Sequence, residues 1–161
     1  MAPIGTFGAN HELVAALNRH GVRYLVVGGA ATKHYVAERQ SEHPGELDVL
    51  VEPTIANAEK VIAALRSIGF ASPDWAPERL AKPWCQLRVD NGYYYADILT
   101  PHADEDFAAY RERALDETIG YERVKVIANE DQQAHLAHSP MEKHKRDIEL
   151  LKAAVRNQQP K

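Results

Sequence analysis

Residues 22–52, VRYLVVGGAATKHYVAERQSEHPGELDVLVE, set the plan of the domain and carry its first functional signal. The apolar run at 22–27 predicts a buried strand that ends in two adjacent glycines. The nine residues after the glycines predict a short helix, so the order is strand, glycine turn, helix. The polar stretch 40–45 contains a proline and a glycine and predicts a loop before a second strand over 46–52.

The second strand opens with two carboxylates, Glu46 and Asp48. Residues two apart in an extended chain project from the same face, so these carboxylates are expected to lie side by side. Two like charges at that distance repel, and each raises the pKa of the other unless a cation compensates them. The pair therefore predicts a metal site or a proton-transfer site.

Size and composition favour a folded, single-domain protein. The chain has 161 residues, of which 45% are hydrophobic and 26% charged, and this excludes wholesale disorder. We expect one domain over 1–161, with an ordered core at about 10–155. The formal net charge of -4 gives no global attraction to nucleic acid or anionic lipid. A single cysteine, no signal-like N-terminus and no long apolar run predict a cytoplasmic protein without a membrane segment.

The rest of the chain alternates between helical and strand-like patterns. Asn10 and Thr54 are the expected N-caps of two helices. The dipeptide Asn91-Gly92 joins two strand-like runs and predicts a hairpin in which both turn residues have positive φ. The expected elements are helices at 11–20, 55–68, 104–114, 130–138 and 141–156, and strands at 84–90, 93–100 and 121–128. Because a hairpin interrupts strict β–α alternation, we expect an α+β (mixed α/β) domain with C-terminal helices.

A third carboxylate, Asp97, lies inside the apolar and aromatic run 93–100, where a charge needs a partner. Three acidic groups on neighbouring strands would hold one or two Mg²⁺ ions, which prefer oxygen ligands and are often completed by substrate phosphates. Gly28 and Gly29 suit phosphates because backbone N–H groups without a Cβ can approach an anion closely at the start of a helix. Each signal alone has a structural alternative: an ordinary strand-to-helix turn for the glycines, and a solvent-facing hairpin residue for Asp97.

The order of these signals resembles the nucleotidyltransferase superfamily typified by DNA polymerase β, in its minimal, single-domain bacterial branch. Shared features are Gly-Gly after a strand, an acidic-x-acidic pair opening the next strand, and a third acid on a later strand. The likeness extends to LDVLVEPTIANAEKVIAALRSIGF at 47–70, ADILT at 96–100 and KHKRDIELLKA at 143–153, and so covers roughly residues 10–155. The resemblance implies a nucleotidyltransferase-like mixed β-sheet with flanking helices.

The resemblance also implies a Mg²⁺-dependent transferase. Glu46, Asp48 and Asp97 would be its catalytic residues and would hold Mg²⁺ that bridges the phosphates of a nucleoside triphosphate such as ATP. Gly28 and Gly29 would cradle those phosphates. An acceptor hydroxyl would then attack the α-phosphorus, with release of pyrophosphate.

Two basic residues after the diglycine belong to the implied nucleotide site. Lys33 is placed to contact phosphates, although a position on the surface explains it equally well. Arg39 lies near the arginine that precedes the acidic pair in related sequences. The acceptor would be a small molecule, an RNA end or a protein hydroxyl, and a homodimer or a partner protein would complete the cleft of so short a chain. Members of this branch often serve as halves of toxin–antitoxin systems, which the resemblance allows here.

The chain departs from the family pattern at three places. Glu46 stands where the family more often has aspartate, and the extra methylene moves the carboxylate by more than roughly one ångström. The loop at 40–45 is longer than usual, and the basic residues of the terminal helix follow a different spacing: Lys143, Lys145 and Arg146. An alternative function therefore stays open, that of a catalytically inactive nucleotidyltransferase fold that binds a nucleotide or a partner protein.

Histidines near the C-terminus suggest a third class of function, that of a zinc-dependent hydrolase. His135, His138 and His144 lie on two predicted helices and together could form the zinc site of a hydrolase. A solvated helix surface explains the same residues without a metal. The aromatic run at 93–95 leaves a similar choice between stacking a base and filling a β-surface.

Overall fold

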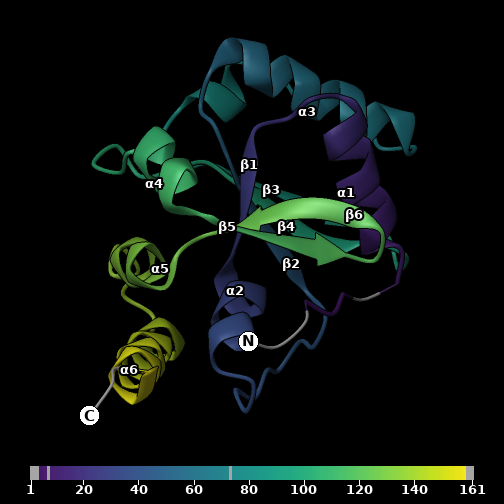
Figure 1. Ribbon diagram of the computed structural model, residues 1–161. Coiled ribbons are helices and arrows are strands. Elements are labelled where there is room, and N and C mark those ends of the chain that lie inside the picture. Colours follow the sequence, from purple (N-terminus) through teal and green to yellow (C-terminus); the bar gives the residue numbers. More distant parts are fainter. Residues whose placement is uncertain (1–3, 7, 73, 159–161) are drawn as a thin grey trace.

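The computed structural model describes residues 4–6, 8–72 and 74–158. These residues form a six-stranded mixed sheet in the order β3-β4-β2-β1-β6-β5, with helices packed around it (Figure 1). The predicted α+β class is confirmed. The strands are β1 (Tyr24–Val27), β2 (Leu47–Val51), β3 (Gln86–Asp90), β4 (Tyr95–Leu99), β5 (Leu115–Ile119) and β6 (Glu122–Val126). The helices are α1 (Asn10–Arg19), α2 (Gly28–Tyr35), α3 (Ile55–Ser67), the short 3₁₀ helix η1 (Arg79–Ala81), α4 (Phe107–Arg113), α5 (Asn129–Leu136) and α6 (Glu142–Gln158).

The centre of the sheet brings the predicted functional segments together. β1 pairs with β2 in antiparallel orientation, and β2 pairs with β4 in parallel orientation. β3 and β5, at the two edges, each form an antiparallel hairpin with the neighbouring strand. In this register Asp48 lies beside Val27 of β1 on one side and beside Asp97 of β4 on the other. The glycine turn after β1 is therefore adjacent to two of the predicted acids.

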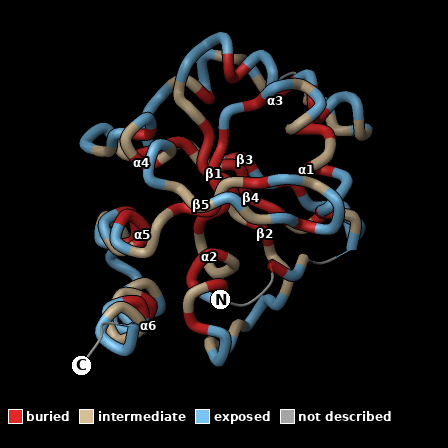
Figure 2. The backbone as a smooth tube through the Cα atoms, in the orientation of Figure 1, coloured by how far each residue is buried: buried red, intermediate tan, exposed pale blue. Residues whose placement is uncertain are grey.

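Burial explains why β1 and β2 occupy the centre. All four residues of β1 are buried, and so are four of the five residues of β2. Such continuous apolar runs suit strands that are covered on both faces. β3 instead alternates between exposed and buried residues, as expected for a strand with one solvated face. Figure 2 shows the buried positions gathered in the sheet and the exposed positions on the outer surfaces of the helices.

Five of the helices form two groups. α1 packs against α3 and also contacts β6. α2, α5 and α6 form the second group, in which α2 contacts both other helices and α5 packs against α6; they lie together in the lower part of Figure 1. This second group stands at the end of β1 and β2 where the acids lie, so it can close a site there. Among the described residues, no helix combines the length and apolar character needed to cross a membrane.

The two predicted helix caps have different outcomes. Thr54 caps α3 as predicted, since its hydroxyl oxygen accepts a hydrogen bond from the N–H of Asn57 at 3.2 Å. Asn10 is not an N-cap, so that prediction was wrong: it is the first residue of α1 and is fully buried. Its side chain accepts from the N–H of Tyr95 at 2.7 Å and donates to the carbonyl of Tyr95 at 2.9 Å. A buried amide must be paired, and here the pairing ties α1 to β4.

The hairpin between β3 and β4 is present, but its turn differs from the prediction. Gly92 has a φ of +88°, whereas Asn91 does not adopt a positive φ. The Asn91 carboxamide oxygen accepts hydrogen bonds from the backbone N–H groups of Tyr93 and Tyr94. The connection is therefore a wider loop over 91–94, stabilised by a side chain, and it shifts the register of the hairpin.

Candidate active site

The three predicted carboxylates converge at the centre of the sheet. Glu46 directly precedes β2, Asp48 lies on β2, and Asp97 lies on the adjacent strand β4. One oxygen atom from each side chain lies within 4.8 Å of the others. Within the part of the chain that the structure describes, no other cluster of acidic, histidine or cysteine side chains is compact enough to hold a metal ion.

Burial makes this cluster electrostatically unfavourable without a cation. The Asp97 side chain is only 8% exposed, and its Oδ1 atom is buried with no hydrogen-bond partner. Burial, together with the charges of Glu46 and Asp97, raises the pKa of Asp48 from 3.8 to about 7. A divalent cation would pair the orphaned oxygen and favour the ionised carboxylates. Because Mg²⁺ prefers such oxygen donors, these three residues fit that ion.

Arg88 on β3 also belongs to the cluster, and the sequence did not point to it. Its Nη1 atom donates hydrogen bonds to Glu46 Oε1 at 2.9 Å and to Asp97 Oδ2 at 2.8 Å. Its guanidinium carbon lies 4.5 Å from the centre of the Tyr95 ring, which is a cation–π contact. A two-residue turn would have paired Arg88 with Tyr95, whereas the wider loop pairs it with Asp97.

Gly28 has a structural reason for being glycine that differs from the predicted one. It is the first residue of α2 and has a φ of +65°, in the left-handed region that side chains disfavour. A Cβ atom at this position would overlap the Asp48 side chain. The turn therefore allows the Asp48 carboxylate to lie directly against the backbone. Gly28 is also tied to α5, because its carbonyl accepts a hydrogen bond from Gln132 Nε2 at 2.9 Å.

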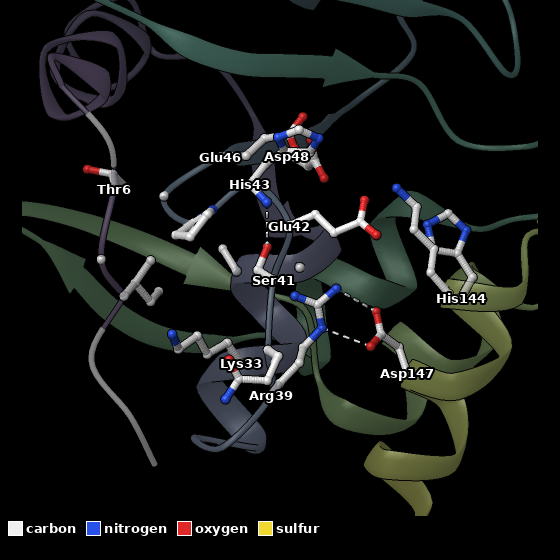
Figure 3. Close-up of a pocket in the computed structure, with 18 of the residues that line it drawn as sticks. Thr6, Lys33, Arg39, Ser41, Glu42, His43, Glu46, Asp48, His144 and Asp147 are labelled. Carbon is white, nitrogen blue, oxygen red and sulfur yellow. Dashed lines mark hydrogen bonds and ion pairs between the residues drawn. The ribbon is translucent and has the colours of Figure 1, made fainter.

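A cavity of about 640 Å³ adjoins the carboxylates on the side of α2. Residues 4–6, α2, the loop 39–46 and α6 form its wall (Figure 3). Glu46 and Asp48 lie at one end of it. Its cationic lysine and arginine side chains are Lys33, Arg39, Lys143 and Arg146. Several positive charges beside carboxylates that fit a divalent cation make this cavity suitable for a polyphosphate.

Within this cavity, Arg39 has a partner that the sequence did not identify. Its guanidinium donates to both carboxylate oxygens of Asp147 on α6, at 2.8 and 3.0 Å, and Figure 3 shows the two side chains facing each other. A Cβ on Gly29 would lie 2.9 Å from Arg39 Nη1. The structure thus places Gly29, Lys33 and Arg39 along one wall, with Arg39 already bound to Asp147.

A second cavity of about 310 Å³ also adjoins the carboxylates. Glu46, Asp48 and Asp97 line it, together with Trp84 and residues from α5 and from the start of α6. Gly28 faces this smaller cavity, whereas Gly29 faces the larger one. The carboxylate cluster therefore borders both cavities, and groups in the two cavities can meet there.

The histidines near the C-terminus do not form the alternative zinc site. His135 Nδ1 lies 2.8 Å from Glu105 Oε2, and His144 Nδ1 lies 2.6 Å from the hydroxyl oxygen of Ser139. His138 stacks on another imidazole instead. In the described ranges these side chains do not gather as a group of metal ligands. The aromatic run at 93–95 packs in part against the rest of the protein. Tyr94 is buried, and the ring of Tyr95 lies beneath the Arg88 guanidinium.

Two solved structures of one protein resemble this chain. ANT(2″)-Ia, an aminoglycoside nucleotidyltransferase in complex with adenylyl-2″-tobramycin, has a TM-score of 0.53 at 12% sequence identity and covers 91% of this chain and 87% of its own. The solution structure of the antibiotic-resistance factor ANT(2″)-Ia has a TM-score of 0.54 at 13% identity, with coverage of 91% and 82%. No protein-family model and no curated protein sequence matches the chain. At these identities the likeness concerns the fold: the chain has a nucleotidyltransferase-like fold.

Proposed function

We propose that this protein is a Mg²⁺-dependent nucleotidyltransferase. It would move a nucleoside monophosphate from a nucleoside triphosphate to an acceptor hydroxyl and release pyrophosphate. The observation that carries the proposal is the convergence of Glu46, Asp48 and Asp97 within 4.8 Å, beside a cationic cavity and a second cavity. The nucleotidyltransferase-like fold supports the same reaction by analogy.

In this proposal the larger cavity holds the triphosphate. Lys33, Lys143 and Arg146 line the cavity and would bind phosphate oxygens. Gly28 and Gly29 begin α2. Gly29 lines the larger cavity, where its backbone would approach the phosphates, and Gly28 lines the smaller cavity beside the carboxylates. Arg39 would act differently from the lysines, because its bonds to Asp147 make it a positioning residue that joins the loop to α6.

The carboxylates would direct the transfer itself. Glu46, Asp48 and Asp97 would hold Mg²⁺, which when bound supplies positive charge at the attacking and leaving oxygens. Asp97 lines the smaller cavity and would accept the proton of the acceptor hydroxyl as that oxygen bonds to the α-phosphorus. The bond between the α-phosphorus and the α–β bridging oxygen breaks at the same time, and the β- and γ-phosphates leave as pyrophosphate.

One observation favours a second candidate function, an inactive fold that binds a nucleotide or a partner protein. Arg88 Nη1 contacts both Glu46 and Asp97 and so places a positive charge inside the carboxylate cluster. If this contact persisted when nucleotide is bound, the cluster would have its counter-charge without a metal. In the active protein Arg88 would instead turn outward towards solvent, to which its side chain is already 42% exposed.

Nucleotide binding and transfer can be tested separately. Each nucleoside triphosphate with Mg²⁺ should raise the melting temperature of the wild type, and Asp48→Asn should abolish this gain. Asp116→Asn is the matched control, because Asp116 is an exposed carboxylate on β5, at the opposite edge of the sheet from β3. Transfer is measured with nucleotides labelled at the α-phosphate and mixed small-molecule, RNA and protein acceptors. Binding with transfer supports the enzyme, and binding without transfer supports the inactive fold that binds a nucleotide. The absence of both contradicts these two proposals and leaves the inactive fold that binds a partner protein.

The sequence resemblance to the minimal bacterial branch supports a finer proposal, that the chain is one half of a toxin–antitoxin pair. For the toxin half, we expect expression of the wild type to arrest bacterial growth and Asp48→Asn to leave growth normal. Arrest by both proteins to the same degree would contradict a toxic nucleotidyl transfer.

A further inference from the structure

Trp84, which lines the smaller cavity, has an unusual backbone conformation. Its φ is +54°, and no other non-glycine residue in the described ranges has a positive φ. A bulky side chain in this region is strained, and such strain persists where the surroundings hold it. The Trp84 N–H donates to the carbonyl of Pro101 at 2.9 Å, and the N–H of Cys85 donates to Thr100 Oγ1 at 2.7 Å. Hydrogen bonds on both sides of the strained position thus fix the backbone that carries the indole.

Three imidazole rings make contact with this indole. The Trp84 ring makes edge contacts with His102, His135 and His138, with centroids 5.3, 6.4 and 6.2 Å away. His102 and His138 stack on each other with a centroid distance of 4.5 Å. We call these four residues the ring cluster. Despite these contacts Trp84 remains 51% exposed, so about half of its surface stays accessible to a ligand.

A buried carboxylate holds two members of the ring cluster in place. The Glu105 side chain is 0% exposed and accepts hydrogen bonds from His135 Nδ1 and from the backbone N–H of His102, both at 2.8 Å. Although burial alone would raise the pKa of Glu105, the hydrogen bonds and the positive potential of His135 lower it, so the group stays ionised. A buried charge that orients the His135 ring and holds the backbone of His102 is the kind of support that binding sites need.

The smaller cavity also lacks the groups that would bind a cationic acceptor. Apart from Glu46, Asp48 and Asp97, its lining within the described residues contains no carboxylate. The remaining lining combines aromatic, aliphatic, hydroxyl and cationic groups, including Trp84, Leu136, Met141, Ser139 and Lys143. Such a surface suits a neutral or anionic ligand with an apolar plane.

We propose that the smaller cavity is the acceptor site and that the acceptor carries a planar heteroaromatic ring, which stacks on the exposed part of Trp84. This inference rests on the proposed function, in which the triphosphate occupies the larger cavity. The acceptor hydroxyl would then lie next to Asp97, which lines the same cavity. Stacking is tolerant of ring identity, so Trp84 would favour any planar aromatic ring rather than one particular ring.

The test is a calorimetric titration of wild-type protein saturated with Mg²⁺ and α,β-methylene-ATP. The ring-bearing probes are adenosine and cytidine, and the control ligand is tobramycin, a polycationic sugar without an aromatic ring. We expect both nucleosides to bind, Trp84→Leu to weaken them by roughly tenfold or more, and Trp84→Phe to retain most of the affinity. Tyr121→Leu is the matched control, because Tyr121 is a fully exposed aromatic residue in the turn between β5 and β6, outside the smaller cavity.

A glycine variant separates loss of the ring from loss of folding. Trp84→Gly removes the indole but accepts the positive φ, so we expect its melting temperature to equal or exceed that of the wild type while nucleoside binding falls. Equal nucleoside affinity in wild type and Trp84→Leu overturns the inference. So does a loss of α,β-methylene-ATP affinity in Trp84→Leu, because the ring on Trp84 would then be the nucleotide base. Failure of α,β-methylene-ATP to bind the wild type contradicts the proposed function instead, and nucleoside titrations without it still test the ring site.

Discussion

At Asp48, burial and two neighbouring carboxylates act in the same direction, and both disfavour the ionised form. Arg88 compensates part of this charge by bonding to Glu46 and Asp97. The buried Oδ1 atom of Asp97 nevertheless has no partner. In the absence of a bound cation, these side chains therefore lower the stability of the fold, which is characteristic of a site built for a ligand rather than for packing.

The raised pKa of Asp48 predicts how stability depends on pH without metal. The pKa of Asp48 is about 7 in the folded protein and near 3.8 in the unfolded chain. At a pH between these two values, the folded protein therefore holds a proton that the unfolded chain has lost. Stability should therefore fall as the pH rises from 4 to above 7, by on the order of 2–4 kcal/mol. We expect Asp48→Asn to lack this component in urea unfolding with chelator present. Parallel curves for wild type and variant across that range would contradict the assignment.

Arg88 should compete with divalent cations for the carboxylates. Arg88→Gln removes the guanidinium that bonds to Glu46 and Asp97, so a cation need not displace it. We expect Mn²⁺ to bind this variant about tenfold more tightly in calorimetry, or about 1.4 kcal/mol. The metal-free variant should be less stable than wild type, because the carboxylates lose their counter-charge. Arg23→Gln, at a surface ion pair with Glu52, is the control. Weaker Mn²⁺ binding in Arg88→Gln would show that Arg88 assists the metal.

Among the elements, the junction between β1 and α2 determines where the carboxylates lie. Gly28 begins α2 at a φ of +65°, and the Asp48 side chain occupies the space that a Cβ would need. Gly69 after α3 is a useful comparison, because its φ is also positive, +93°, and nothing lies within 4 Å of the position that a Cβ would take there. Substitutions at these two glycines therefore separate the energetic cost of backbone strain from the cost of crowding by a side chain.

We expect Gly28→Ala to reduce the free energy of unfolding more than Gly69→Ala does. The backbone penalty is common to both, at about 1–2 kcal/mol, and crowding against Asp48 adds about 1–3 kcal/mol at Gly28 alone. Chemical denaturation of both variants measures the difference. Equal losses would mean that Asp48 moves away without cost and that its close approach to Gly28 does not contribute to the free energy of unfolding.

The bridge between Arg39 and Asp147 connects two elements of the larger cavity, the loop after α2 and helix α6. Both side chains are largely buried, at 13% and 6% exposure, so removing one partner leaves an unpaired buried charge. We expect Asp147→Ala to cost about 3 kcal/mol in unfolding free energy and to increase hydrogen exchange in α6. The exposed pair Arg23–Glu52 provides the comparison, since Glu52→Ala should cost less than about 1 kcal/mol. Similar losses for both variants would exclude a special role for the buried bridge.

For the whole molecule, the order of elements and the acid positions followed from local patterns, whereas the partners of those acids did not. The apolar run 22–27, the glycine turn and the apolar run around Asp48 are local signals, and all three segments form elements of the predicted type. β5 was missed because LDETI is polar and half-exposed, and it becomes a strand by pairing with β6 at the sheet edge. Arg88 and Asp147 were missed because a wider hairpin loop and the packing of α6 place them.

The linings of the two cavities could not be predicted from local sequence patterns either. A net charge of -4 gave no sign of a cationic wall, because that wall combines residues from α2, its following loop and α6. The ring cluster likewise joins residues 84, 102, 135 and 138, which are distant in the chain. Only tertiary packing brings such groups together, and local periodicity contains no information about it.

The most direct test of a shared cation site is a crystal structure of the wild type soaked with Mn²⁺, using the anomalous signal of the metal. We expect a peak about 2.1–2.2 Å from oxygens of Glu46, Asp48 and Asp97, with the Arg88 guanidinium turned away from them. A fully soaked crystal with no peak among these carboxylates, and with Arg88 still bonded to Glu46 and Asp97, would contradict a shared cation site.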